Sequence, residues 1–220
     1  MSDGVAIKLT HGFAFDHLVW GCADLAAGVA SLAAKLGVRA ETNMDPDEDY
    51  PTISAGIGLG GGAFLEVIAP NPRFTGPSTG LHALLTSLET PRFLTWFARV
   101  TSLATAASAL DAAGETLRPM MDQWERTGLP AFRNGFIESE QFNLSVPYLI
   151  EWRDPATGGD HDRPRLEVAG FRVRSADVER TQALHTLLGL EVEIEGASRN
   201  SLCLDLRTAE GVVSLHGPEL

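Results

Sequence analysis

The chain has 220 residues, of which 44% are hydrophobic and 21% are charged, a composition typical of a soluble globular protein. Its formal net charge of −12 disfavours a protein that binds the phosphate backbone of a nucleic acid. Two cysteines, an N-terminus without a targeting pattern, and no apolar run of about 20 residues predict a cytoplasmic protein with no membrane partner.

The first predicted unit, about residues 14–70, opens with the apolar strand-like run FDHLVWGC, which contains His17. A helix pattern follows, with Asp24 as its N-cap and Gly37 as its stop. Three β-like runs complete the unit: VRAET, TISAGIGL and AFLEVIAP. The glycines of GIGLGG fit a dinucleotide-binding pattern, but a strand follows them instead of a helix, so they predict a hairpin turn.

The same order is predicted twice more along the chain. After a turn-rich linker with a short helix around residues 81–88, a second unit covers about residues 92–155, and a third covers 165–220. The three helix patterns open at Leu25, Leu103 and Val178, which are 78 (103 − 25) and 75 (178 − 103) residues apart. Repeats of this length indicate that one structural unit is used three times.

These patterns predict an α+β fold in which repeated βαβββ units form a curved mixed sheet, a cup, with helices on its outer face. Residues 1–155 are expected to form one domain from two units, with residues 165–220 as a third βαβββ unit. A lone unit leaves a sheet edge and an apolar face uncovered. We therefore expect the third unit to pair with its counterpart in a homodimer or to pack against the first two units.

The order βαβββ, the DHLVW opening, the DLAAG helix start and the strands AFLEVIAP and YLIEWRDP resemble the glyoxalase-like proteins of the vicinal-oxygen-chelate superfamily, which includes glyoxalases, bleomycin-resistance proteins and extradiol dioxygenases. The resemblance is best over about residues 14–155. It implies a divalent metal ion in the cup, held by the first and last strands of two paired units. Such an ion acts as a Lewis acid on a substrate with two neighbouring oxygens.

The register of the two units suggests which residues fill these positions. His17 lies eight residues before Leu25, and Thr95 lies eight before Leu103. Glu66 and Glu151 each lie four residues before a proline, Pro70 or Pro155. By resemblance, His17, Glu66 and Glu151 are the expected metal ligands, and the two glutamates are the expected catalytic acids or bases.

This donor set suits Mn, Fe, Zn, Ni or Mg without choosing among them. Thr95 at the fourth position is a poor ligand, which leaves open a site that has lost its metal and kept its pocket. Each ligand also has a simpler interpretation: His17 as a core or rim histidine, and each glutamate as the partner of an arginine.

Strand alternation predicts the lining of the cup. Thr95, Phe97, Arg99 and Arg153 are the candidate substrate-binding residues. Arg99 and Arg153 either anchor an anionic substrate or neutralise the glutamates. The other residues expected on this face are Phe15, Val19, Phe64, Ile68, Phe93 and Leu149.

Two functions follow from these expectations. One is a metal-dependent isomerase, lyase or related enzyme that acts on a small oxygen-bearing molecule. The other is a metal-free protein of the same fold that binds or sequesters a small molecule. Metal analysis of the purified protein distinguishes them.

Overall fold

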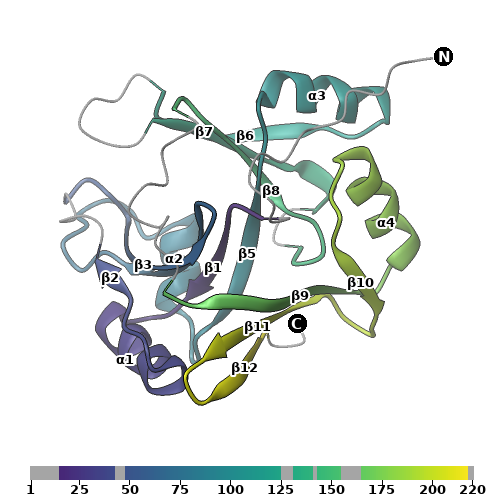
Figure 1. The fold of residues 1–220 in the computed structure, drawn as a ribbon. Coiled ribbons are helices and arrows are strands. Elements are labelled where there is room, and N and C mark those ends of the chain that lie inside the picture. Colours follow the sequence, from purple (N-terminus) through teal and green to yellow (C-terminus); the bar gives the residue numbers. More distant parts are fainter. Residues whose placement is uncertain (1–14, 43–47, 125–130, 141–142, 155–164, 218–220) are drawn as a thin grey trace.

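The computed structural model describes residues 15–42, 48–124, 131–140, 143–154 and 165–217. The first unit consists of β1 (His17–Gly21), α1 (Leu25–Leu36), β2 (Glu41–Thr42), β3 (Thr52–Gly60) and β4 (Ala63–Pro70), and α2 (Gly80–Thr86) follows it. The second consists of β5 (Arg92–Arg99), α3 (Leu103–Ala112), β6 (Leu117–Asp122), β7 (Phe132–Ile137), the 3-10 turn η1 (Glu138–Glu140) and β8 (Tyr148–Trp152). The third consists of β9 (Glu167–Ser175), α4 (Val178–Leu187), β10 (Glu193–Gly196), β11 (Ser201–Thr208) and β12 (Gly211–His216), as Figure 1 shows. The predicted order βαβββ is therefore confirmed in all three units.

The predicted helix ends are confirmed by their hydrogen bonds and backbone angles. The Asp24 side chain accepts a hydrogen bond from the amide of Ala27 at 2.7 Å, and so caps the start of α1. Gly37, which ends α1, has a φ of 68°, in the left-handed region that glycine adopts without steric cost. The glycine-rich run forms the β3–β4 hairpin turn, where Gly60, Gly61 and Gly62 all have positive φ.

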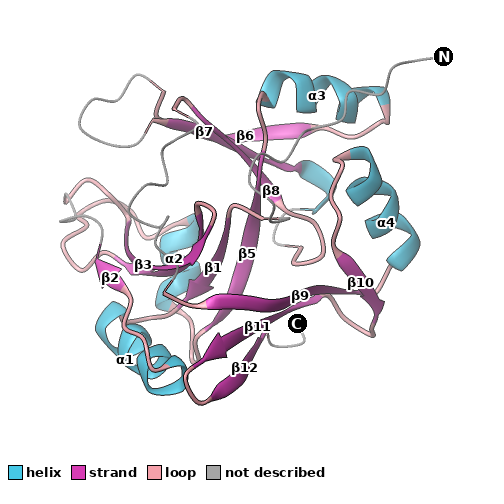
Figure 2. Cartoon of the chain, in the orientation of Figure 1, coloured by secondary structure: helices cyan, strands magenta, loops and turns pink. Residues whose placement is uncertain are grey.

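The first two units form one curved eight-stranded sheet in the order β2-β3-β4-β1-β5-β8-β7-β6 (Figure 2). They meet at its centre, where β1 and β5 pair antiparallel, while each pairs parallel with the last strand of its own unit. The Tyr50 hydroxyl accepts a hydrogen bond from the Gln123 side chain, which joins the segments beside β3 and β6. This contact joins segments near the two ends of the sheet. The βαβββ units and their curved mixed sheet confirm the fold class predicted from the sequence.

The two faces of the sheet carry separate apolar clusters. The convex face includes Leu18, Trp20, Leu65, Trp96 and Leu149, which pack under α1, α3 and the third unit. The concave face is lined by Val19, Ile68, Leu94, Phe97, Tyr148 and Ile150. α2 is an exception to the expected placement of helices on the outer face, because Leu84, Leu85 and Leu88 in and just after it pack on the concave side.

A β-bulge in the central pair of strands changes the predicted lining of the cup. Val19 lies opposite Thr95 but Trp20 lies opposite Phe93, so Leu94 is an extra residue on β5. Phe93 consequently packs with Trp20 on the convex face, at a ring distance of 4.8 Å, and its predicted place in the cup is wrong.

The third unit has the expected element order but a different strand pairing. Its sheet runs β10-β9-β11-β12, so β9 pairs with strands on both sides within its own unit. In the first unit the corresponding strand, β1, pairs with the last strand and leaves its other edge for β5. In the third unit β11 pairs with that edge of β9. The third unit therefore does not form half of a cup as each of the first two units does.

Of the two expected arrangements of the third unit, packing against the first two units is found. The ring of Phe171 lies 4.9 Å from that of Phe15 and 5.2 Å from that of Trp96. Arg180 on α4 donates 2.7 Å hydrogen bonds to Glu115 and to Glu140. Apolar residues of the third unit belong to the convex-face core, which is therefore shared by all three units.

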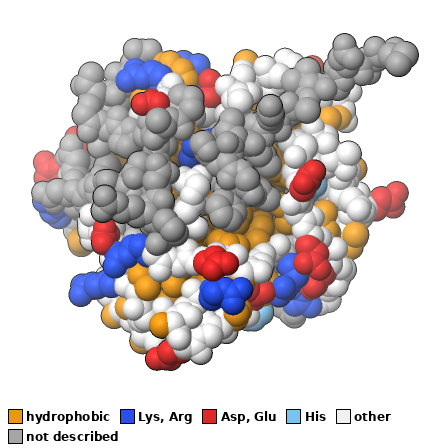
Figure 3. All heavy atoms as spheres, in the orientation of Figure 1, with side chains coloured by type: hydrophobic (Ala, Val, Ile, Leu, Met, Phe, Trp, Pro, Cys, Tyr) orange, Lys and Arg blue, Asp and Glu red, His pale blue; other side chains and the backbone are white. Residues whose placement is uncertain are grey.

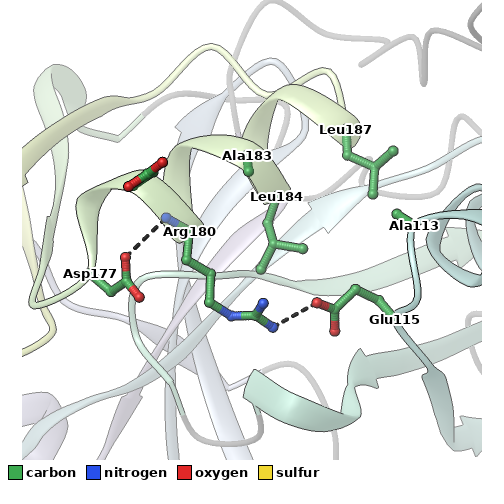
Figure 4. A pocket seen from close by; sticks show the side chains of 8 residues that line it. Ala113, Glu115, Asp177, Arg180, Ala183, Leu184 and Leu187 are labelled. Atoms are coloured by element: carbon green, nitrogen blue, oxygen red, sulfur yellow. Dashed lines mark hydrogen bonds and ion pairs between the residues drawn. The ribbon is translucent and has the colours of Figure 1, made fainter.

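A groove of about 530 Å³ lies between the end of α3 and α4. Figure 4 shows Arg180 reaching from α4 toward Glu115 along this groove, with Leu184 and Leu187 beside it. The polar side chain that lines it most prominently, Arg180, is paired with Glu115, Glu140 and Ser139. This groove lies outside the cup.

His185 on α4, which contacts Ser145 of the second unit, makes the stability of the protein sensitive to acid. Its ring is buried, Nε2 lies 2.8 Å from the carbonyl oxygen of Ser145, and the buried Nδ1 has no hydrogen-bond partner among the described residues. Burial lowers the pKa of His185 below its ordinary value. Below about pH 6.5 the unfolded chain binds a proton that the folded protein resists, so stability falls as the pH drops through this window toward the lowered pKa.

We expect the free energy of unfolding to fall more steeply between pH 7 and pH 5 in the wild-type protein than in His185→Gln, by up to about 1.4 kcal/mol per pH unit. Urea titrations at the two pH values measure the difference. His216→Gln is the matched control, because His216 is exposed. Equal pH dependence in the wild type and His185→Gln would contradict the interpretation.

Candidate functional site

His17 belongs to a row of five ring side chains on the concave face. Its imidazole stacks between Phe64 on β4 and Phe97 on β5, at ring distances of 4.7 and 4.2 Å. Phe97 contacts Tyr148 on β8, which contacts Phe136 on β7, each at 5.4 Å. The row follows from the strand register, which places His17 opposite both Phe64 and Phe97, and Phe97 opposite Tyr148. Five adjacent strands thus contribute one ring each.

The Asp16 carboxylate, whose side chain is completely buried, holds one side of this histidine. It accepts hydrogen bonds from His17 Nδ1 at 2.7 Å, from Arg99 Nε at 2.6 Å and from Trp152 Nε1 at 3.1 Å. Burial by itself would raise the pKa of Asp16, but the hydrogen bond to His17 and the charges of His17 and Arg99 lower it below its ordinary value. Asp16 is therefore an ionised acceptor at neutral pH, and the hydrogen on Nδ1 is donated to it.

Glu66 lies on the other side of the imidazole. Its Oε2 is 4.0 Å from His17 Nε2, and its side chain is 22% exposed. Within the part of the chain that the structure describes, no group donates a hydrogen bond to this carboxylate. The sequence placed Glu66 and His17 on one face, and the structure does bring these two side chains together. An imidazole and a carboxylate that face each other in this way are suited to general acid–base chemistry.

Arg99 and Thr95 also lie where the sequence placed them, on the buried concave side. Arg99 pairs with Asp16 and not with Glu66 or Glu151, the two glutamates that it was expected to neutralise. Thr95 lies opposite Val19, and its hydroxyl donates a 3.4 Å hydrogen bond to the carbonyl of Trp96. The DH pair in DHLVW was the available signal for Asp16, since a carboxylate next to a histidine is a common orienting partner.

The predicted convergence of Glu151 with His17 and Glu66 is not found. Glu151 Oε2 accepts a 2.9 Å hydrogen bond from the amide of Leu103, at the start of α3 on the convex side. Arg153 is directed elsewhere too, since its Nη1 donates a 2.6 Å hydrogen bond to the carbonyl of Trp124. Phe15 and Leu149, expected in the lining, belong to the convex-face core.

The strand register explains the error. The 78-residue spacing between α1 and α3 maps Val19 onto Phe97, and these residues lie opposite Glu66 and Tyr148 respectively. Tyr148 is therefore the counterpart of Glu66. β4 continues to Pro70, whereas β8 ends at Trp152, so counting back from Pro70 and Pro155 shifts the comparison by three residues and selects the opposite face.

Metal ligation was tested against the donors that the structure describes. Residues 15–42, 48–124, 131–140, 143–154 and 165–217 contain no group of three or more His, Cys, Asp or Glu side chains that could hold an ion. His17 and Glu66 supply two donors, and the equivalent positions of the second unit carry the neutral hydroxyls of Thr95 and Tyr148. Protein sites for divalent transition metals usually supply three or more imidazole, thiolate or carboxylate ligands. The described residues do not fit the predicted metal site.

Glu151→Ala is expected to lower the free energy of unfolding by about 1 kcal/mol, because the variant removes a carboxylate that caps α3. The His17 ring resonances should stay unchanged. Denaturant titration and NMR measure the two effects, with the exposed Glu138→Ala as control. Unchanged stability together with a perturbed His17 would contradict this placement.

The face of the protein that Figure 3 shows is mixed in charge. On the face seen in Figure 3, acidic and basic side chains of the described residues are interspersed, with apolar atoms between them. No helix of the described residues is long and apolar enough to cross a membrane.

Comparisons with known proteins agree with the fold. The chain matches a hypothetical protein from Staphylococcus aureus with 11% identity and a TM-score of 0.55, over 92% of this chain and 84% of that one. It matches methylmalonyl-CoA epimerase from Mycobacterium tuberculosis with 18% identity and a TM-score of 0.47, over 67% and 89%. It matches a variant of 4-hydroxymandelate synthase from Streptomyces coelicolor with 17% identity and a TM-score of 0.49, over 92% of this chain and 62% of that one. At 11% identity the Staphylococcus aureus structure shows the fold alone, and the two matches with TM-scores below 0.5 add nothing to it.

No curated protein matches the chain. The sequence profile of the glyoxalase-like domain family matches residues 15–189, which is well over half of the chain. This match includes the whole of the cup and the beginning of the third unit through α4. Together with the fold, it shows that the chain belongs to the glyoxalase-like domain family of the vicinal-oxygen-chelate superfamily.

Proposed function

We propose that the protein binds a small oxygen-bearing molecule on the concave face and transfers a proton to or from it, as an isomerase or lyase. The observation that carries this proposal is the arrangement of Asp16, His17 and Glu66. Asp16 holds the imidazole by Nδ1, and Nε2 lies 4.0 Å from the carboxylate of Glu66. An oriented base beside a second proton-accepting group is the arrangement that general acid–base catalysis requires.

Each group has a distinct part in the proposed reaction. His17 Nε2 takes a proton from the bound molecule, and the buried Asp16 carboxylate stabilises the imidazolium that forms. The imidazolium passes this proton to the Glu66 carboxylate, 4.0 Å away, which returns it to a neighbouring atom of the substrate. An isomerisation moves a proton between adjacent atoms, so two groups separated by 4.0 Å can each reach one of them. Phe64 and Phe97 fix the imidazole plane by stacking on both of its faces.

No step of the proposed reaction requires a metal ion, because the described side chains do not fit a metal site. We expect purified protein that has been incubated with Mn, Zn or Ni and then dialysed to retain well below one equivalent of metal. Elemental analysis by mass spectrometry measures it, with His17→Ala and Glu66→Ala as comparisons. One equivalent in the wild type that is lost in both variants would instead support the metal-dependent enzyme expected from the sequence.

A second candidate function is sequestration of a small molecule without chemistry. The aromatic lining favours it, because the partly buried Phe132, Phe136 and Trp152 pack with the buried Phe97 and Tyr148 in one apolar cluster on the concave side. Such a surface binds planar molecules whether or not a reaction follows. The two candidates share the binding site and differ only in proton transfer.

Hydrogen–deuterium exchange separates them. The protein is incubated in D₂O with a panel of small α-hydroxy carbonyl and 1,3-dicarbonyl compounds, and loss of the acidic C–H signals is followed by NMR. If the protein is an enzyme, at least one compound should exchange its hydrogen faster with the protein than in buffer alone. This acceleration should be lost in His17→Gln. Binding to the wild type without accelerated exchange would support sequestration instead.

A further inference from the structure

We infer that the concave face selects ligands that present a hydrogen-bond donor, either a hydroxyl or a protonated nitrogen, to His17 and Glu66, and discriminates against ligands that present only acceptors there. The inference rests on the proposed function, since it takes the concave face as the ligand site. It adds the chemical class of the group that the ligand places against these two side chains.

The first step is the tautomer of His17. Asp16 forms a buried ion pair with Arg99, whose guanidinium is always charged and whose Nε lies 2.6 Å from Oδ2, and Oδ2 also accepts from Trp152 Nε1. These contacts and the lowered pKa of Asp16 show that its carboxylate is ionised, and its Oδ1 lies 2.7 Å from His17 Nδ1. A carboxylate can only accept, so the neutral imidazole must carry its hydrogen on Nδ1. Nε2 then presents a lone pair to the concave face.

The second step is that two acceptors converge on one region. The Nε2 lone pair and the Glu66 Oε2 are 4.0 Å apart, and none of the described residues donates a hydrogen bond to either atom. A ligand carbonyl, ether, carboxylate or phosphate oxygen placed there would meet two electron-rich atoms and leave both unsatisfied. A ligand O–H or N–H satisfies at least one of them.

The 4.0 Å distance between His17 Nε2 and Glu66 Oε2 also favours particular hydrogen-bond donors on the ligand. A ligand atom about 2.8 Å from both acceptors would see them at an angle of about 90°, which is near the angle between two N–H bonds of an ammonium group. An ammonium nitrogen can therefore bind both acceptors, and a hydroxyl can bind either one. Phe64 and Phe97 on the two sides of His17 add apolar and cation–π contacts for a planar or cationic ligand.

The tautomer is tested first, because its measurement needs no ligand. In ¹⁵N-labelled protein, two-bond ¹⁵N–¹H correlations of His17, assigned with the His17→Gln variant, report which ring nitrogen carries the hydrogen. At a pH where the ring is neutral, we expect Nδ1 to be protonated and Nε2 to have the shift of an unprotonated nitrogen. A hydrogen on Nε2 overturns the inference.

The ligand class is tested with three planar probes of matched size: 2-naphthol, 2-methoxynaphthalene and 2-naphthoate. Binding is measured by NMR titration of the protein. We expect 2-naphthol to bind at least about tenfold more tightly than the other two. The methoxy probe isolates the loss of the donor, since it is uncharged, whereas the naphthoate also adds repulsion from the acidic protein.

Glu66→Gln provides the sharper comparison, because its amide presents a donor in place of a carboxylate. The preference for naphthol over the methoxy probe should narrow to about threefold or less. Glu138→Gln, an exposed control, should keep the wild-type preference. Equal binding of all three probes to the wild type overturns the inference while leaving the concave face as a binding site. Binding of none of them counts against the proposed function itself, and with it against the ligand class.

Discussion

Asp16→Ala is expected to lower the free energy of unfolding by about 3–5 kcal/mol, the cost of breaking a buried ion pair from one side. The variant removes the carboxylate that pairs with the buried guanidinium of Arg99 and accepts from the indole N–H of Trp152. It also removes a side-chain link between the segment before β1 and the strands β5 and β8. Urea denaturation of the wild type and the variant measures the loss.

Two comparisons make this prediction specific to the buried pair. Glu138→Ala, which removes an exposed partner of Arg118, should cost about 1 kcal/mol or less. In Asp16→Leu/Arg99→Met both charges are absent, so the double variant should be destabilised by less than the sum of the two single changes. Additive effects, or a loss no larger than that of Glu138→Ala, would contradict the role given to Asp16.

His17→Gln and Glu66→Gln are each expected to slow proton transfer by about 10²–10⁴-fold, the usual contribution of a positioned acid or base. This corresponds to about 3–5 kcal/mol of transition-state stabilisation. Both variants keep a polar side chain of similar size, so their thermal midpoints should change little compared with that of Asp16→Ala. The measurement is the deuterium exchange rate of whichever compound the wild type accelerates.

Glu151→Gln is the matched control for these two variants. Glu151 was predicted to be a catalytic metal ligand like Glu66, but its carboxylate accepts a hydrogen bond from Leu103 at the start of α3. Its exchange rate should equal that of the wild type. A loss in Glu151→Gln as large as that in Glu66→Gln would mean that the exchange site is not the one described on the concave face.

Most of the fold was predictable because its signals are local. The N-cap Asp24 and the stop at Gly37 mark the two ends of α1 by backbone chemistry alone, and the structure has both of them. The alternation in AFLEVIAP also placed Glu66 and Phe64 on one face correctly. Local chemistry does not say which strands pair, so the sheet order of the third unit could not be predicted.

Only the part of the candidate site that lies in the first unit was predictable. His17 and Glu66 belong to strands of one unit, and their shared face follows from alternation. Glu151 was misplaced because the face of a β-strand reverses with a shift of one residue, and counting from Pro155 gave a shift of three. The bulge at Leu94 reversed Phe93 in the same way. Asp16 was missed because its partners, Arg99 and Trp152, are 83 and 136 residues away in the sequence.

The joining of two units in one chain at the β1–β5 pair has a consequence for how a substrate enters. If two identical chains met at such a pair, every residue would occur twice about a twofold axis, and a guest could bind in either of two equivalent orientations. Here His17 and Glu66 on one side correspond to Thr95 and Tyr148 on the other. The two units therefore differ at these positions, so the concave face proposed as the binding site presents different groups to the two ends of a ligand.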